Sequence, residues 1–347
     1  MESLNIVFTG KNEVEVRREP VAALQSGQIL VESRCTLIST GTEGIVLARK
    51  FEAGTHWDHW VKYPHAPGYN CAGRVLDVAP DVTNWKVGDR IASRSPHQQF
   101  RVLDADPQSA ILRLAPIPAA ISDEEAAWFG MACIAQVGVH TAKHELGDAV
   151  VLVGLGVLGQ LVTQYVRNLG AREIIVIDTS EMRLEMARAH GATHVLKTGV
   201  EDARDRVLEL TNGRGADVVY DITGFPDVFA PALGLARKFG KLVLLGDTGT
   251  PSLQHLTPDV IRRGVRVLGA HDDHAPTQES DTNRWTKRNM TDLFFTFLER
   301  GQMRVADLIT HRYAPQEAPQ AYQMLQTNRA AAMGIVFDWT QVEQITS

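Results

Sequence analysis

Residues 151–159 read Val-Leu-Val-Gly-Leu-Gly-Val-Leu-Gly. The glycines follow a short apolar run, the order expected of a strand, a tight turn and a helix. In a dinucleotide-binding unit, Gly154 would make the turn, Gly156 would let a pyrophosphate approach the backbone, and Gly159 would pack the helix on the strand. Apolar residues then recur at three- and four-residue spacing, which predicts a helix with one apolar face: Leu158, Leu161, Val162, Tyr165, Val166 and Leu169.

The start of this helix is the expected pyrophosphate site. Helix N-termini carry unpaired N–H groups and a partial positive charge, which favour an anion. We therefore expect the backbone at Gly156, Val157 and Leu158 to contact the phosphates. The alternative is an ordinary strand-to-helix turn with no ligand.

An acidic residue ends the next apolar segment. Asp178 lies about 20 residues past the glycines, where a carboxylate can accept hydrogen bonds from ribose hydroxyls. A 2′-phosphate would be repelled there, and the first arginine to follow is Arg183, after Thr179. We predict that these three residues bind NAD(H) and not NADP(H). The alternative role for Asp178 is a helix cap.

Composition limits the kind of protein. A length of 347 residues suggests two domains. The net charge of −6 argues against nucleic acid as a partner, and no apolar run is long enough to span a membrane. The three cysteines are too few for a disulfide framework. With no signal-like segment at the start, these features predict a cytoplasmic protein.

From residue 147 onward, strand and helix patterns alternate. The expected strands are Ala149–Val153, Ile174–Asp178, His194–Leu196, Asp217–Ile222, Leu242–Gly246 and Val265–Ala270. The expected helices include Ser180–His190, Asp202–Leu210 and Pro226–Lys238. This alternation predicts an α/β fold with a doubly wound, parallel, six-stranded Rossmann sheet. Residues just past the strands should line the nicotinamide side of the cofactor: Thr223, Gly246, Asp247 and His271.

The first 110 residues show a different pattern. Short alternating segments separated by Gly, Pro and Asn predict a β-rich domain: Asn5–Thr9, Ile29–Ser33, Gly73–Ala79, Arg90–Ser93 and Phe100–Leu103. Ser122 and Glu125 form a capping-box pattern that begins a helix at 123–128. After residue 273 we expect helices at Met290–Arg300 and Pro315–Thr327 and a last strand at Gly334–Trp339.

Several segments together resemble the medium-chain dehydrogenase/reductase superfamily over nearly the whole chain. They are Pro67–Gly73, Val87–Arg90, the glycine pattern and Gly240–Gly246. Val137–His140 and Leu308–Arg312 are similar to the polyol and threonine dehydrogenases, and Ile38–Glu43 is similar to the bacteriochlorophyllide dehydrogenase type. The resemblance implies a GroES-like catalytic domain (residues 1–133 and 273–347) and a Rossmann domain (residues 134–272).

Two motifs depart from the zinc-dependent members that the chain resembles. Their Cys-Gly-Thr/Ser-Asp signature reads Thr40-Gly41-Thr42-Glu43 here, and their Gly-His-Glu reads Gly68-Tyr69-Asn70. In the region of the third zinc ligand, the polyol dehydrogenases that the chain resembles have a glutamate, and this chain has Cys133. These side chains do not make a tetrahedral zinc site, so we predict a zinc-free member with no metal ligands.

Without zinc, the reacting oxygen needs another hydrogen-bonding group. The resemblance implies that Thr40, Thr42 and Tyr69 cluster where the metal would lie, with Glu43 orienting them and Asn70 beside them. We hypothesise that Tyr69 or Thr42 bonds the reacting oxygen. The alternative is that packing side chains simply fill the vacated site and that cofactor positioning alone supplies catalysis.

Aromatic residues are candidates for substrate contacts. Trp57 and Trp60 belong to a loop that often covers the substrate in the resembled family, and the alternative is a packed loop or a subunit contact. Cys133 and Trp285 complete the predicted substrate-binding set. His56 and His59 lack a third metal ligand nearby, and we interpret His97 as structural.

The leading functional interpretation is a zinc-independent, NAD(H)-dependent dehydrogenase of a secondary alcohol, either a polyol, a sugar derivative or a cyclic alcohol. Polar groups such as Glu43, Asn70 and His271 suit a hydroxylated substrate. The alternatives are a quinone or enone double-bond reductase and a non-catalytic dinucleotide-binding protein. We expect a small alcohol or ketone as the partner molecule and, by the family's habit, a homodimer or homotetramer.

Overall fold

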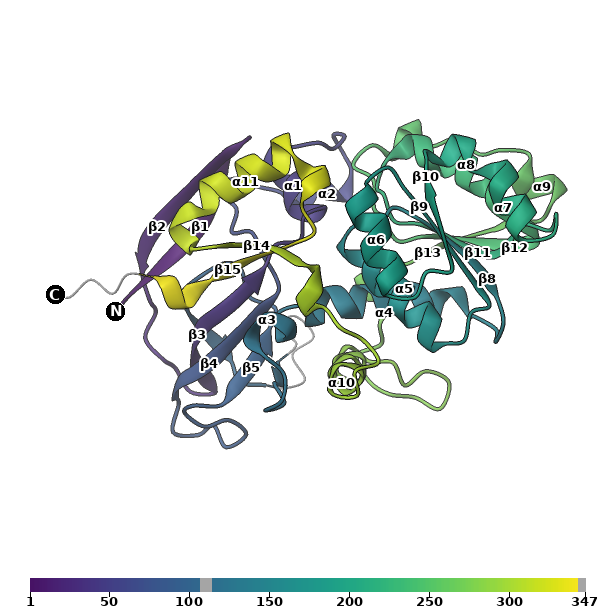
Figure 1. Cartoon of the computed structure of the whole chain (residues 1–347). Coiled ribbons are helices and arrows are strands. Elements are labelled where there is room, and N and C mark those ends of the chain that lie inside the picture. The colour runs from purple at the N-terminus through teal and green to yellow at the C-terminus, as the bar shows by residue number, and fades with distance from the viewer. Residues whose placement is uncertain (107–113, 343–347) are drawn as a thin grey trace. The chain divides into compact units, whose positions relative to one another are not determined.

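The computed structural model describes residues 1–106 and 114–342 and divides into two compact units (Figure 1). Unit 1 consists of Met1–Arg49, His59–Met131 and Pro276–Ser347. Unit 2 consists of Lys50–Asp58 and Ala132–Ala275. The short segment 50–58 therefore belongs with the part of the chain that carries the glycine pattern.

Unit 2 is built on a six-stranded sheet in the order β10-β9-β8-β11-β12-β13. Its strands are β8 (Ala149–Val153), β9 (Glu173–Asp178), β10 (His194–Lys197), β11 (Ala216–Asp221), β12 (Ala236–Leu244) and β13 (Arg266–Gly269). Every neighbouring pair is parallel. The strand order reverses between β8 and β11, which confirms the predicted doubly wound Rossmann sheet.

Helices cover the sheet because its central strands are apolar on both faces. They are α4 (Phe129–Ala142, which starts in unit 1), α5 (Val157–Asn168), α6 (Glu181–Ala189), α7 (Arg204–Leu210), α8 (Pro226–Leu235) and α9 (Asp259–Arg262). α7 and α8 lie side by side (Figure 1) and pack Val207, Ala232 and Leu233 onto Val151 and Val219 of the sheet. This packing fixes the strands whose carboxyl ends adjoin the glycine turn.

One predicted helix boundary was wrong. The expected helix Pro226–Lys238 ends at Leu235, and β12 begins at once with Ala236, which pairs with Ala216 of β11. Phe239 has a φ of +61°, so the segment cannot continue as a helix. Gly246, predicted to end this strand, lies two residues beyond it.

Unit 1 is the β-rich part of the chain, as predicted. A seven-stranded sheet has the order β14-β15-β3-β4-β5-β7, with β6 also paired to β3, and β1 and β2 form a separate antiparallel pair. The strands are β1 (Glu2–Gly10), β2 (Glu13–Pro20), β3 (Gln28–Leu37), β4 (Cys71–Val78), β5 (Arg90–Ser93), β6 (Phe100–Asp104), β7 (Ala115–Pro116), β14 (Ile309–Tyr313) and β15 (Gly334–Asp338). β2 was not predicted, because its charged residues leave little apolar alternation to detect.

Short helices complete unit 1. They are α1 (Thr42–Ala48), α3 (Asp123–Ala126), α10 (Lys287–Glu299) and α11 (Ala318–Thr327), while α2 (His56–Trp60) crosses the boundary between the units. The predicted capping box is present: the Glu125 N–H donates to Ser122 Oγ at 3.2 Å, and the Ser122 N–H donates to Glu125 Oε2 at 3.0 Å. It fixes the start of the segment that leads into α4.

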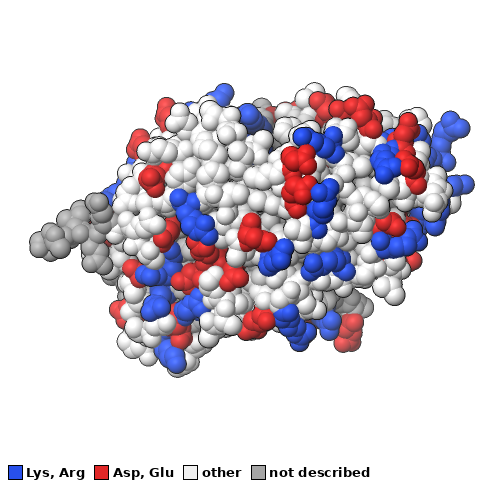
Figure 2. Space-filling view, in the orientation of Figure 1, with Lys and Arg blue, Asp and Glu red and all other residues white. Residues whose placement is uncertain are grey.

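Two surface properties bear on partners. Among the described residues, no helix has the length and apolar character needed to cross a bilayer. Figure 2 shows Lys and Arg side chains interspersed with Asp and Glu side chains over the visible face. That face therefore presents charges of both signs and no uniformly basic surface.

Candidate functional site

The loop after β8 forms the turn that the glycine pattern predicted. Gly154 has a φ of +93°, which favours glycine. A Cβ on Gly159 would overlap the Gly154 carbonyl oxygen, so α5 packs directly on the turn. A Cβ on Gly156 would meet no atom within 4 Å. The turn thus leaves open space at Gly156, next to the first residues of α5, Val157 and Leu158.

Asp178 ends β9 and connects two loops. Its Oδ2 accepts the Leu155 N–H at 2.8 Å, and its Oδ1 accepts the Ser180 N–H at 2.8 Å. Each carboxylate oxygen retains a second lone pair for a ribose hydroxyl. Burial lowers the pKa of Arg183, and the Asp178 carboxylate opposes that effect, so the two side chains lie near each other. Thr179 is exposed. These residues and the open glycine turn fit a dinucleotide.

The carboxyl ends of β8 and β11 meet beside this turn. A Cβ on Gly154 would lie 2.8 Å from Thr223 Cγ2, so Thr223 packs on the glycine loop. The Gly246 N–H donates to the Asp221 carbonyl at 2.9 Å, which holds the loop after β12 against β11. Of the residues predicted to line the nicotinamide side, the structure brings Thr223 and Gly246 next to this turn.

Asp247 and His271 follow two neighbouring strands and are both exposed. Asp247 Oδ2 lies 2.8 Å from His56 Nε2. Ser252 Oγ also donates to Glu52 Oε1 at 2.5 Å, so segment 50–58 is anchored on the loop after β12. His271 Nδ1 accepts the Asp273 N–H at 3.2 Å and caps a short 3₁₀ turn.

In unit 1, Tyr69 lies at the centre of a hydroxyl cluster. Its phenol donates to Ser39 Oγ at 2.5 Å and lies 3.5 Å from Thr42 Oγ1. Met131 Sδ is 3.6 Å from the same oxygen. The Arg94 guanidinium stacks over the ring, with its carbon 4.5 Å from the ring centroid. The structure therefore brings together the two residues for which a role at the reacting oxygen was hypothesised.

Burial raises the pKa of Tyr69 above its usual value. Hydrogen bonds with Ser39 and Thr42 and the charge of Arg94 act in the opposite direction, and the Glu43 carboxylate adds to the increase. The phenol is therefore protonated near neutral pH, and with its single O–H donated to Ser39 Oγ its oxygen can accept a hydrogen bond from a substrate hydroxyl.

Glu43 is a buried carboxylate, 2% exposed, in the first turn of α1. Its Oε1 accepts the Ser39 N–H at 2.8 Å. Its Oε2 accepts the Tyr322 hydroxyl at 2.5 Å and lies 3.2 Å from His97 Nε2. These partners compensate the cost of burying a charge. Glu43 thereby fixes the backbone of Ser39, the residue that accepts from Tyr69.

The buried polar chain extends beyond His97. His97 Nδ1 lies 2.8 Å from Thr36 Oγ1, and the Trp339 indole N–H donates to that same oxygen at 2.9 Å. Both His97 and Thr36 are fully buried. We define the buried network as Tyr322, Glu43, His97, Thr36 and Trp339. It joins α11, α1, β3 and the C-terminal segment under the Tyr69 cluster.

The other predicted catalytic residues lie nearby in sequence. Thr40 is half-buried, and Asn70 is fully buried with its Nδ2 3.4 Å from the Leu37 carbonyl. Thr40 and Tyr69 occupy positions that the resemblance assigns to zinc ligands, but they offer a hydroxyl and a phenol where zinc takes thiolate, imidazole or carboxylate. Over residues 1–106 and 114–342, no three His, Cys, Asp or Glu side chains gather as a metal site. The residues present do not fit zinc.

The predicted substrate-binding residues are dispersed. Trp57 is buried in unit 2, whereas Trp60 is exposed in unit 1 and meets the His65 ring edge-on. Trp285 is half-buried under the Arg284 guanidinium. Cys133 is buried near Tyr165, whose pKa is raised mainly by burial and further by the Cys133 side chain. Met131, not Cys133, lies beside Tyr69. Residues two apart on a helix point in nearly opposite directions, so Cys133 points away from the side of α4 that carries Met131.

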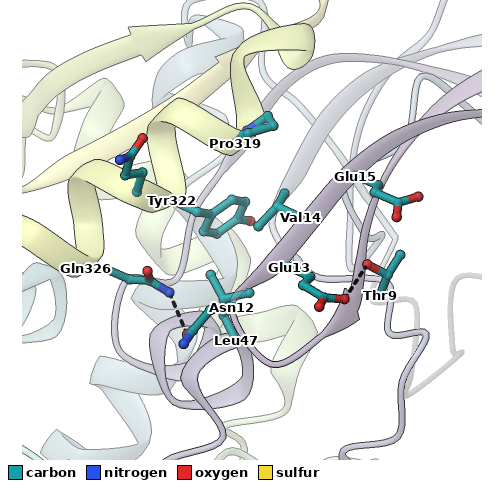
Figure 3. A pocket seen from close by; sticks show the side chains of 10 residues that line it. Thr9, Asn12, Glu13, Val14, Glu15, Leu47, Pro319, Tyr322 and Gln326 are labelled. Atoms are coloured by element: carbon teal, nitrogen blue, oxygen red, sulfur yellow. Dashed lines mark hydrogen bonds between the residues drawn. The ribbon is translucent and has the colours of Figure 1, made fainter.

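A polar groove of about 550 Å³ lies between the β1–β2 turn and α11 (Figure 3). Its lining includes the carboxylates of Glu13 and Glu15 and the ring of Tyr322, whose hydroxyl belongs to the buried network. Gln326 Nε2 donates to Asn12 Oδ1 at 2.9 Å across the groove. Within residues 1–106 and 114–342, Tyr322 is the one groove residue named here that hydrogen-bonds to the buried network. The groove is therefore separate from the Tyr69 cluster.

Sequence reasoning missed Ser39, Arg94, Met131 and Tyr322 and gave His97 no part in the site. Ser39 directly precedes the Thr-Gly-Thr-Glu segment, so its place in the loop was a usable signal. The other four residues join the site only through tertiary packing, and no local pattern marks them.

Two family models match the chain: the alcohol dehydrogenase GroES-like domain over residues 25–106 and the zinc-binding dehydrogenase over residues 157–279. Among curated proteins, the chain is 25% identical to L-threonine 3-dehydrogenase of Bacillus licheniformis over 308 residues, which cover 81% of this chain and 86% of that protein. It is 29% identical to sorbitol dehydrogenase of Bacillus subtilis (strain 168) over 291 residues, with coverages of 76% and 80%.

Solved structures share the fold at lower identity. A protein of Sinorhizobium meliloti 1021, described as a zinc-binding dehydrogenase and bound to NADP, has a TM-score of 0.79 at 19% identity, with 97% of this chain and 99% of that chain covered. An alcohol dehydrogenase of Escherichia coli CFT073 in complex with NADH has a TM-score of 0.79 at 17% identity, with the same coverages. The chain belongs to the medium-chain dehydrogenase/reductase superfamily and is an alcohol-dehydrogenase-like oxidoreductase.

Proposed function

We propose that the protein oxidises a secondary alcohol to a ketone with NAD⁺ as the hydride acceptor and without zinc. The observation that carries the proposal is the Tyr69 cluster: a half-buried phenol bonded to Ser39, with Thr42 3.5 Å away, at the position of a family zinc ligand. The curated relatives, dehydrogenases of threonine and sorbitol, support a hydroxylated small molecule as the substrate.

The chemistry divides between cofactor and protein. Oxidation of an alcohol removes a hydride from carbon and a proton from oxygen, and a nicotinamide held at the glycine turn would supply the hydride acceptor. The Tyr69 oxygen accepts a hydrogen bond from the substrate hydroxyl while the phenol O–H donates to Ser39 Oγ, so Tyr69 can take the substrate proton as it passes its own proton on. The proton leaves through the hydroxyls that surround Tyr69, each receiving one proton and passing on another. Thr42 is half-buried and connects these hydroxyls to solvent.

Glu43 acts in this proposal as a positioning residue. It accepts the Ser39 N–H and is itself held by Tyr322 and His97, so the Ser39 hydroxyl keeps its place beside the phenol. Preorganised polar groups lower a barrier because they need not reorient during the reaction. Arg94 contributes a cation over the Tyr69 ring, which favours negative charge on the phenol side of the site.

The preference for NAD⁺ rests on Asp178. Its carboxylate follows β9 and retains lone pairs for the ribose hydroxyls, while a 2′-phosphate would face its negative charge. Arg183 is the nearby cation. Burial lowers its pKa, and the Asp178 carboxylate acts in the opposite direction, so the Arg183 charge is compensated by Asp178.

Chains are proposed to associate through β13, the end strand of the unit 2 sheet. Val267 on β13 and Ile261 on α9 are exposed apolar side chains in this region, and an unpaired strand edge readily pairs with a second copy. A lysine at Val267 should shift the sedimentation of the protein toward the monomer.

The test is NADH formation by chelator-treated protein supplied with NAD⁺ and a panel of polyols, sugars, inositols and simple secondary alcohols. Turnover that is unaffected by the chelator supports the proposal and identifies the substrate class. Turnover restored only by added Zn²⁺ overturns zinc independence. Reduction of enones or quinones without alcohol oxidation favours the double-bond reductase, and cofactor binding without any turnover favours the non-catalytic alternative.

A further inference from the structure

Asp221 is a buried carboxyl that the proposed chemistry does not use. It is the last residue of β11, 1% exposed, and its strand neighbours are Val153 of β8 and Leu244 of β12. Its Oδ1 accepts both the N–H and the hydroxyl of Thr223, at 3.0 and 2.8 Å. A carboxylate in such apolar surroundings is costly without a nearby cation.

The charged groups of the elements that pack on β11 have other partners. β8 has no charged residue. The charged residue of α8 is Asp227, which is exposed to solvent. On β12, Arg237 pairs with Asp217, Lys238 lies over the Phe239 ring, and Lys241 donates to the carbonyls of Ala142 and Lys143. Burial raises the pKa of Asp221 from 3.8 to about 6, with the Thr223 bonds opposing the increase. The carboxyl therefore changes charge close to neutral pH.

Asp221 lies at the edge of the sheet where a dinucleotide is expected to bind. The carboxyl ends of parallel strands are where doubly wound sheets bind dinucleotides. Thr223, which Asp221 holds by two bonds, packs on Gly154 of the glycine turn. The Asp221 carbonyl also accepts the N–H groups of Leu245 and Gly246 at 3.0 and 2.9 Å. One residue thus connects the three strand ends that form the predicted cofactor site.

We propose that Asp221 is a proton-linked positioning residue of the dinucleotide site, ionised when the oxidised cofactor is bound and protonated when the reduced cofactor is bound. The oxidised nicotinamide ring is a cation, which stabilises a buried carboxylate. The reduced ring is neutral and leaves the carboxyl without a compensating charge. The proposal rests on a nicotinamide cofactor and on neither the role of Tyr69 nor the absence of zinc.

The proton balance gives a direct measurement. Near pH 6, Asp221 in the free protein is partly protonated. Binding of NADH should take up a fraction of a proton from solvent, and binding of NAD⁺ should release one. Titration calorimetry in two buffers with different ionisation enthalpies counts these protons. As the pH rises through this region, the NADH affinity should weaken by up to about tenfold per pH unit.

Asp221→Asn is the test variant, because both Thr223 bonds use Oδ1 and the amide oxygen can accept them. The matched control is Asp227→Asn, which removes an exposed acid of the same unit. The proposal predicts proton exchange in the wild type and in Asp227→Asn and none in Asp221→Asn. Unchanged proton exchange in Asp221→Asn overturns it, as does a wild type that exchanges no proton with either cofactor form.

A second measurement needs no variant. An infrared difference spectrum between the NADH and NAD⁺ complexes should show a protonated carboxyl band only with NADH. Absence of that band contradicts the proposal even if Asp221→Asn fails to fold. If neither NADH nor NADPH binds the wild type, both this inference and the proposed function fail. If both bind with proton exchange but no alcohol is oxidised, only the proposed function fails.

Discussion

The Tyr322 hydroxyl donates a hydrogen bond of 2.5 Å to Glu43 Oε2 across 279 residues of sequence. Both side chains are buried, and Glu43 also holds the backbone of Ser39. A residue of the last helix thereby determines the geometry of the loop that supports the Tyr69 phenol. The resemblance suggested an orienting acid at Glu43, and the structure adds the groups that orient the acid itself.

Tyr322→Phe should destabilise the protein by about 1.5–3 kcal/mol, because it removes a hydrogen bond to a buried charged group. Tyr63→Phe is the control: the Tyr63 hydroxyl donates to the neutral Val46 carbonyl at 2.6 Å, which predicts a loss of about 0.5–1.5 kcal/mol. Urea unfolding followed by tryptophan fluorescence compares the two variants. A loss in Tyr322→Phe no larger than in Tyr63→Phe would show that Glu43 does not depend on this bond.

The glycine turn predicts opposite behaviour for two alanine substitutions. Gly156→Ala adds a methyl group to open space, so the thermal unfolding midpoint should remain near that of the wild type while NADH binding is lost. Gly159→Ala places the methyl group on the Gly154 carbonyl, so the fold itself should be destabilised. NADH fluorescence titration and thermal unfolding distinguish these effects. Normal NADH affinity in Gly156→Ala would remove the turn from the cofactor site.

Asp178→Asn should weaken the discrimination between NADH and NADPH. The amide can still accept one of the two backbone N–H groups, but it no longer repels a 2′-phosphate. We expect the NADPH/NADH ratio of dissociation constants to fall by about tenfold or more, equivalent to about 1.4 kcal/mol. A ratio that does not change would mean that Asp178 is a cap of the two loops and has no part in cofactor choice.

Asp221 also predicts how stability depends on pH. Its pKa in the folded protein, about 6, lies above the ordinary 3.8, so ionisation penalises the native state. The penalty is absent at pH values below the pKa that Asp221 has in the unfolded chain. It is complete above the pKa that Asp221 has in the folded protein, where it amounts to about 3 kcal/mol. Asp221→Asn should therefore be more stable than the wild type at pH 8, with the two converging near pH 4. Equal stability at both pH values would contradict the buried ionisation.

The sequence predicted unit 2 well because its signals are local. The strand, the glycines, the helix and Asp178 follow one another within about thirty residues, and each has a distinct pattern. The boundary between α8 and β12 was wrong because an apolar segment fits a helix or a buried strand equally well until its pairing with β11 is known. Non-local pairing also explains why the charged strand β2 was missed.

The support of the candidate site was less predictable. Tyr69, Thr42 and Glu43 followed from the family motif, but the partners of Glu43 come from distant segments: His97 is 54 residues away and Tyr322 is 279. Polar side chains in a core are recognisable only when their burial and their partners are known. A histidine interpreted as structural thus proves to contact Glu43, the acid that was predicted to orient the site.

A role for Tyr69 at the reacting oxygen is tested by the turnover of metal-depleted Tyr69→Phe, measured beside the wild type on an alcohol that the wild type oxidises. The substitution removes only the hydroxyl, so NADH affinity should be unchanged. We expect kcat to fall by about 10²–10⁴-fold, the usual contribution of a positioned acid–base group. A Tyr69→Phe enzyme with full kcat would contradict that role and would leave catalysis to cofactor positioning alone.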